Sequence, residues 1–292
     1  MNNVYIHTKD NLKKIIIKYL IFLLPIIFYG IYKNGVLLYQ KDLISFLAIF
    51  KVIYLILIGL FIDFIIRLIF KKKLHIDFDL LSVIIIPLFM PFNINILIYA
   101  GLLLGSMFIY ELLSKLIKIN RCAFIIFIIL ISNLLISSLN FLNPLEEANI
   151  YVFNTLDLLW GRNIGGMSST SIIWGLVLLI LGTIFNDYKW YIPLFSILFF
   201  LGIAFTFDIN TNLYTNSMVI MALILVHIDT RFTPLSKLGG IIYGAILGII
   251  SYFLTIYLDY YYGVFVSILI ISLIYEIVTF KNTKKYMINH KK

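Results

Sequence analysis

Charge is the scarcest property of this sequence. Only 13% of the 292 residues are Asp, Glu, Lys or Arg, whereas 62% are hydrophobic, and the mean hydropathy is +1.03. A water-soluble globule of this length needs far more polar surface than these residues supply. The composition therefore excludes a soluble domain and predicts an integral membrane protein, with the lipid bilayer as its first partner.

Cysteine and the motifs of soluble enzymes are also scarce or missing. Cys122 is the one cysteine, which excludes an internal disulfide and a cysteine-ligated iron-sulfur cluster within the chain. The sequence has no GxGxxG, no phosphate loop, no HExxH and no Cys/His metal spacing. These absences predict no NADH site and no metal site in this chain, and they leave open whether it is an enzyme.

Long apolar runs are what the sequence has in excess. A helix needs roughly 20 apolar residues to cross about 30 Å of hydrocarbon. We therefore expect an all-α polytopic membrane protein with about ten transmembrane helices. The runs lie near residues 15–32, 43–66, 78–91, 95–113, 122–140, 171–186, 188–207, 213–228, 239–257 and 261–279.

The positions of the basic residues predict the orientation. Cytoplasmic loops collect Lys and Arg, and with the N-terminus inside, most of the 23 basic residues fall in inner segments. The outer loops hold Lys33, Lys41 and Arg162. We expect a multi-pass plasma membrane protein with both termini in the cytoplasm. This topology, together with anionic inner-leaflet lipid, accounts for the net charge of +9 without a nucleic-acid partner.

Two of the predicted helices are too short to cross the bilayer. The third, near 80–90, is interrupted by Pro87 and Pro91, and the eighth, near 213–228, has polar residues at both ends. Freed backbone groups at membrane depth are tolerated only beside protein or a water-filled cavity. Each broken helix is the third in a set of five, so we expect two inverted repeats around a central binding cavity.

This pattern predicts a single integral membrane domain over residues 1–292. The first repeat spans about residues 15–140 and the second about residues 171–279. A loop of residues 141–170 joins them, and residues 280–292 form a basic cytoplasmic tail.

Ionisable residues inside the predicted helices have spacings that suggest partners. Asp63 precedes Arg67 by four residues, the order that favours an ion pair on a helix. Glu111 reaches Lys115 by the same spacing. We therefore expect two ion pairs, each within one helix, near the cytoplasmic boundary.

His227 and Asp229 lie where the eighth helix ends. A histidine titrates near neutral pH, and ionisable groups at membrane depth are functional candidates because they are costly to bury. These two residues are the candidates for a proton or cation relay, and a structural role is the alternative.

Four blocks of sequence resemble one known family, in the same order. The block 79–91 is an aspartate-led apolar run that closes on prolines, and 140–144 (NFLNP) is similar to the family's NIFNP. The block 161–171 (GRNIGGMSSTS) aligns without a gap with GNIPGSIGETS, and 227–272 follows ATDPVTSP, a glycine helix and YPEGV. The chain thereby resembles the large membrane subunit shared by the Rnf electron transport complex and the sodium-pumping NADH:quinone reductase (the RnfD/NqrB family).

The resemblance implies a subunit that holds flavin, as FMN or riboflavin, and passes electrons while cations cross the membrane. It implies partners among the other membrane and peripheral subunits of such a complex. The positions that match the family and would line the cofactor cavity are Asn140, Asn143, Thr170, Ser171, Asp229 and Thr233.

The departures from the family concern its polar chemistry. The Ser-Gly-Ala-Thr motif that attaches flavin is missing, and Thr155 is the one threonine in the interval 145–160 that takes its place. Thr155 is the candidate for covalent flavin, and a surface-loop threonine is the alternative. Ser169 and Tyr262 stand where the family has glutamates. The backbone-shaping residues are kept more faithfully than the polar ones.

Two main functions therefore remain open. The first is a subunit of an Rnf- or Nqr-type complex that couples flavin electron transfer to cation translocation. The second is a flavin-free transporter or channel for a small solute on the same fold, with no cofactor. An assembly or scaffold role, in which packing seals the broken helices, is a third and weaker alternative.

Overall fold

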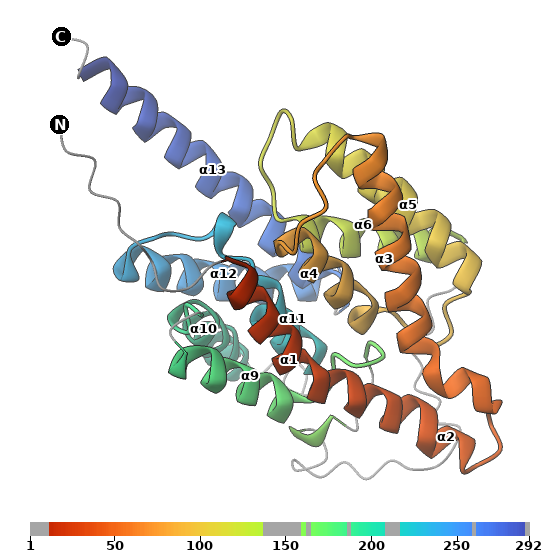
Figure 1. Ribbon diagram of the computed structural model, residues 1–292. Helices are drawn as coiled ribbons and strands as arrows, with labels where there is room; N and C mark the ends of the chain where they lie inside the picture. Colours follow the sequence, from red (N-terminus) through yellow and green to blue (C-terminus); the bar gives the residue numbers. More distant parts are fainter. Residues whose placement is uncertain are drawn as a thin grey trace.

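The computed structural model describes residues 12–136, 159–161, 165–185, 188–207, 217–258 and 261–289, which form helices and turns without any strand (Figure 1). The helices of the first part are α1 (Leu12–Ile31), the π-helical turn η1 (Tyr32–Val36), α2 (Leu37–Tyr39), η2 (Phe46–Phe50), α3 (Lys51–Ile69), α4 (Phe78–Ile85), η3 (Ile86–Phe89), α5 (Ile96–Leu113) and α6 (Arg121–Ile136). The helices of the second part are α9 (Ile172–Ile184), α10 (Tyr191–Phe207), α11 (Ser217–Leu225), η4 (Val226–Ile228), η5 (Thr230–Phe232), α12 (Lys237–Tyr257) and α13 (Gly263–Asn289).

The predicted all-α fold is confirmed, and each predicted apolar run contains one apolar helical segment. Within the described ranges, 4 helices are long and apolar enough to cross a membrane by length and composition. The shorter apolar segments are 78–89, 121–135, 172–184, 191–207, 217–228 and 263–279. These apolar helices support a membrane protein.

The third and eighth predicted helices are short in the structure too. The first runs over 78–89 and the second over 217–228, and each begins as an α-helix and ends in a 3-10 turn. Twelve residues at about 1.5 Å each give about 18 Å of helix, well under the thickness of a bilayer core. Pro87 lies at the start of turn η3, and Met90 after it is extended, so the proline marks the break as the sequence predicted.

Both short helices lie in the interior of the protein. Every residue of α11 is buried, and Leu88, Phe89 and Met90 at the end of η3 have no exposed surface. A helix that ends inside a bilayer leaves backbone groups without partners, and only protein or trapped water can satisfy them. The other helices therefore surround this pair.

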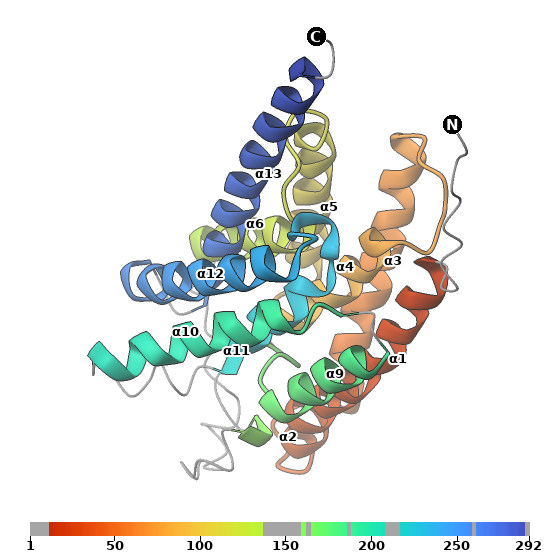
Figure 2. The same ribbon diagram turned by 90° about the vertical axis from the view of Figure 1, so that its left-hand side faces the viewer.

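The helices before and after residue 159 pack in the same order. Helix α4 contacts α1, α3 and α6, while α11 contacts α9, α10 and α13. Helix α5 packs on α3 and α6, while α12 packs on α10 and α13. Contacts of α1 with α9 and of α6 with α13 join the two sets. Figures 1 and 2 both show the C-terminal ends of α3, α5 and α13 at the same end of the molecule.

The two glycine-rich helices pack differently. A Cβ atom at Gly244 would meet the carbonyl oxygen of Ile192 at 2.5 Å, and one at Gly248 would clash with the carbonyl oxygen of Ser196. Glycine therefore allows α12 to approach the backbone of α10 closely. In α5, by contrast, a Cβ atom at Gly105 would meet nothing within 4 Å.

This difference predicts opposite effects of two matched substitutions. Gly248→Ala forces α12 away from α10 and is expected to lower the free energy of unfolding by about 1–3 kcal/mol, the usual cost of overpacking. Gly105→Ala is expected to be neutral or stabilising, because alanine favours a helix and the added methyl group has room. Thermal unfolding in one detergent compares the two variants, and equal midpoints would contradict the packing.

Candidate functional site

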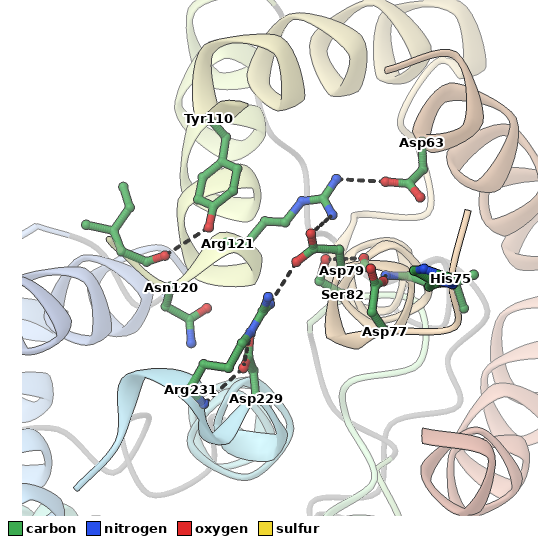
Figure 3. A network of polar contacts seen from close by, with 12 residues as sticks. Asp63, His75, Asp77, Asp79, Ser82, Tyr110, Asn120, Arg121, Asp229 and Arg231 are labelled. Atoms are coloured by element: carbon green, nitrogen blue, oxygen red, sulfur yellow. Dashed lines mark hydrogen bonds and ion pairs between the residues drawn. The ribbon is translucent and has the colours of Figure 1, made fainter. Parts of the chain in front are cut away.

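A buried arginine holds together the ends of three helices. Arg121, at the start of α6, has a side chain that is 1% exposed and binds Asp63 of α3 at 2.8 Å. The same guanidinium lies 3.4 Å from Asp79 in the first turn of α4. Asp63 also binds Arg67 at 2.6 Å, so the predicted pair within α3 is confirmed as part of a larger network. Figure 3 shows the contacts of Arg121 with Asp63 and Asp79.

A second arginine joins the two short helices. Arg231, in η5, binds Asp79 at 2.7 Å and Asp229 at 2.7 Å through Nη2, and its Nε donates to Asp229 at 2.9 Å. Asp79 lies in the first turn of α4, whereas Asp229 directly follows η4. Figure 3 shows Arg231 between the two carboxylates. Arg231 therefore links the end of η4 to Asp79, which lies 152 residues before it in the sequence.

The local sequence explains why carboxylates are present at these helix ends. Asp77 caps α4 by accepting a hydrogen bond from the backbone N–H of Leu80 at 3.0 Å, and Asp229 accepts one from the backbone N–H of Arg231 at 3.1 Å. Acidic groups are favourable at helix N-termini because of the helix dipole. Burial lowers the pKa of Arg231, but the hydrogen bonds and charges of Asp229 and Asp79 outweigh this effect and raise it. The bridge therefore stays charged.

The opposite ends of the short helices meet at the segment 165–171. The backbone N–H of Met167 donates to the carbonyl of Met90 at 2.9 Å, and those of Ser168 and Ser169 donate to the carbonyl of Leu88 at 3.0 and 3.1 Å. These bonds satisfy carbonyls that η3 leaves free where it ends. A Cβ atom at Gly165, built on a left-handed backbone with φ +157°, would lie 3.4 Å from Met218 of α11, which places the segment between both helices.

A buried lysine binds this segment. Lys33, in the π-helical turn η1, is 1% exposed, and its Nζ donates to Thr170 Oγ1 at 2.9 Å. Its neighbour Asn34 donates to the carbonyl of Met167. The expectation that Lys33 lies in an outer loop was wrong, because the helix continues through η1 and carries Lys33 into the interior.

The structure divides the predicted cofactor residues between two places. Thr170 and Ser171 lie in the segment at the far end of the short helices, whereas Asp229 binds Arg231 and Thr233 accepts a hydrogen bond from Lys189 at 3.0 Å. About 18 Å of helix separates the two ends, and the residues of α11 between them are buried. The predicted Asn140, Asn143 and Thr155 lie outside the described residues. The described members of the set therefore lie in two groups, one at each end of the short helices.

One other sequence-based expectation is corrected. Glu111 binds Lys72 at 2.5 Å rather than Lys115, whose ammonium lies over the ring of Phe70.

His227 is buried beside the end of the eighth predicted helix. Its Nδ1 lies 2.9 Å from the carbonyl of Leu223, and its Nε2 has no partner among the described residues. No hydrogen bond connects His227 with Asp229 in this part of the chain, and their role in a relay stays a prediction.

Sequence analysis missed the residues of the ionic network. Arg121 and Arg231 counted only among the basic residues of the inner segments, Asp79 only began an aspartate-led run, and Lys33 was expected in an outer loop. The available signal was the position of the charged residues at helix ends. Asp77 and Asp79 lie at the start of α4, and Asp229 follows η4. Arg231 comes two residues after Asp229, and Arg121 begins α6. No spacing along one helix relates these residues, because they meet only when four elements come together. In the described residues, no group of three or more His, Cys, Asp or Glu could hold a metal ion.

Comparisons with known proteins add no family assignment. No model of a protein family matches the chain, and no curated protein matches it significantly. The functional conclusion therefore rests on the residues and contacts described above.

The buried network predicts that loss of Arg121 is costly. Arg121→Met leaves Asp63 and Asp79 with one guanidinium fewer in the interior and is expected to destabilise the protein by about 3–5 kcal/mol. Lys73→Met removes an exposed charge from the same end and is expected to change stability by less than about 0.5 kcal/mol. Chemical unfolding in detergent measures both variants. Adding Asp63→Asn to Arg121→Met should recover part of the lost stability. A double variant whose loss of stability equals the sum of the two single losses would contradict the ionic contact.

Proposed function

We propose that this chain is the membrane subunit of an ion-translocating electron transport complex of the Rnf and sodium-pumping reductase type. The observation that carries the proposal is the position of the segment 165–171, which belongs to the block that resembles the family. This segment is bonded to the end of η3 and lies against the start of α11. The family-like block thus occupies the junction of the two broken helices, where transport folds of this plan place their ion site.

The order of helix contacts supports an inverted repeat. The helices α1, α3, α4, α5 and α6 correspond in their contacts to α9, α10, α11, α12 and α13, and the contacts between the sets join first with first and fifth with fifth. A twofold relation produces this pattern of contacts. Because each set has an odd number of crossings, successive sets run in opposite directions through the membrane.

The basic residues support an orientation with both termini in the cytoplasm. The C-terminal ends of α3, α5 and α13 lie together in Figures 1 and 2, and each is followed by or contains lysines within a few residues. Such clustering is expected on the cytoplasmic side of a plasma membrane. The arginine network then lies at the inner end of the short helices, and the segment 165–171 lies at their outer end.

The junction offers oxygen atoms to a cation. Ser168, Ser169, Thr170 and Ser171 have no exposed surface, and the hydroxyl groups of the three serines have no hydrogen-bond partner among the described residues. Hydroxyl and carbonyl oxygens are the ligands that hard cations prefer. Buried hydroxyl groups without partners are costly, so their retention at this junction favours a role in passing ions.

The described members of the predicted cofactor set lie at two ends of the short helices, and we assign no electron-transfer step to them. Electron transfer is therefore assigned to the partner subunits that the resemblance implies, and translocation to this chain. The separation of the predicted cofactor residues also favours the second candidate, a flavin-free transporter or channel for a small solute. Its supporting observation is that the predicted cofactor residues lie at opposite ends of the short helices.

The proposal predicts that cation movement depends on the junction and on an electron donor. In sealed inverted vesicles that contain the complex, Thr170→Val removes the hydroxyl that Lys33 binds and is expected to lower donor-driven cation uptake about tenfold, the scale of one charge-assisted hydrogen bond. Thr206→Val serves as the control, because Thr206 bonds only within its own helix at an exposed site.

Two outcomes would contradict the proposal. Equal uptake in both variants would exclude the junction from the ion path. A colourless chain, purified from native membranes without partner subunits, that moves a solute without an electron donor would establish the second candidate instead.

A further inference from the structure

A cavity of about 520 Å³ lies beside the arginine network. Its walls come from the C-terminal end of α5, the loop that follows it, the start of α4, η5 and residues 275–279 of α13. Arg231 and Asp79 form part of its lining (Figure 3). The cavity is thus placed at one end of the helices rather than at the junction to which we assign ion passage.

Three hydroxyl groups in the cavity wall already use their protons. Tyr110 donates to the carbonyl of Ile119 at 3.2 Å, Ser114 donates to the carbonyl of Glu111 at 3.0 Å, and Thr279 donates to carbonyls of its own helix. Each hydroxyl has only one proton to donate. Among the hydroxyl groups of the lining, Tyr275 therefore remains as a donor for a ligand.

Three cationic side chains of the cavity have unused donors. Lys118 lines the cavity and has no ion pair among the described residues. Lys72 is 41% exposed and makes its one ion pair with Glu111, which leaves further N–H groups on its ammonium. Arg231 directs Nε and Nη2 to carboxylates, while its Nη1 has no acceptor in the described part of the chain. Three cations from three separate loops therefore have donors free for one acceptor.

The two acids in the wall, Asp79 and Glu276, do not occupy all of these donors. Asp79 is already bound by Arg121 at 3.4 Å and Arg231 at 2.7 Å. Glu276 is the remaining acid of the lining and has no ion pair among the described residues. A ligand with anionic oxygens and a neighbouring donor group, such as a hydroxyl, matches this distribution.

The cavity lies where apolar helices give way to segments rich in lysine. Helix α5 ends at Leu113, and α13 continues beyond Thr279 into a stretch with lysines at positions 281, 284 and 285. Aromatic side chains of Tyr110, Phe232 and Tyr275 line it, as is common at the membrane interface. Basic pockets between transmembrane helices on the cytoplasmic side suit anionic headgroups.

We propose that this cavity binds the phosphate group of an anionic inner-leaflet phospholipid, with Lys72, Lys118 and Arg231 as its cationic partners. Glu276 accepts a hydrogen bond from a headgroup hydroxyl, and the aromatic wall contacts the glycerol portion. The lipid thereby bridges α5, η5 and α13. This site is independent of the proposed translocation.

The test measures binding of dioctanoyl-phosphatidylglycerol to the full chain in a neutral detergent by native mass spectrometry. Lys118→Gln removes an exposed cation and is expected to raise the apparent Kd about tenfold, the scale of one charge-assisted hydrogen bond. Lys73→Gln removes an exposed cation that does not line the cavity and is expected to leave the Kd unchanged. Glu276→Gln is expected to keep binding equal or tighter, because it removes a negative charge.

The outcomes separate a lipid from a soluble phosphate. Lipid binding that millimolar inorganic phosphate does not displace supports a phospholipid headgroup as the natural ligand. Displacement by inorganic phosphate, with the same loss in Lys118→Gln, supports a phosphate site whose ligand is soluble. Equal Kd values in the wild type, Lys118→Gln and Lys73→Gln would overturn the proposal.

Discussion

The structure depends on one constraint: two helices of about 18 Å end inside the protein, and each end needs polar partners. At one end Arg231 holds Asp79 of α4 and Asp229 after η4. At the other end the segment 165–171 donates backbone hydrogen bonds to the carbonyls that η3 leaves free. The surrounding helices follow from this requirement, because a helix that stops at membrane depth must be enclosed by protein on all sides.

The charged groups of the arginine network are costly to bury, and their contacts hold the helices in one geometry. Asp63 and Arg121 are almost completely buried, and removing charges from water is unfavourable unless they are well paired. Asp63 and Asp79 each bind a guanidinium from another element, so one geometry satisfies both carboxylates. Shifting α4 relative to α6 or η5 breaks several of these contacts at once. The network therefore fixes the relative positions of the helices more than it adds net stability.

Sequence reasoning succeeded where the signal is local. The apolar runs predicted the helices, and Pro87 predicted the end of α4 and η3, because hydrophobicity and proline act on the residues that carry them. It failed where partners come from different helices: Glu111 pairs with Lys72 rather than with the lysine four residues away. The site residues taken from the resemblance were grouped by alignment, which contains no distances, and Thr170 and Asp229 proved to lie at opposite helix ends.

Fixed charges compensate the dipole of the first short helix at both of its ends. Asp77 and Asp79 lie at the positive N-terminal end of α4, where carboxylates are favourable. Just beyond η3, the ammonium of Lys51 donates to the carbonyl of Phe92, and Lys33 donates to the segment that covers this end. A diffusing cation that approaches these oxygens meets a tethered ammonium already bound there. Ion passage along this route therefore requires the lysines to move, which couples any translocation to a change at the junction.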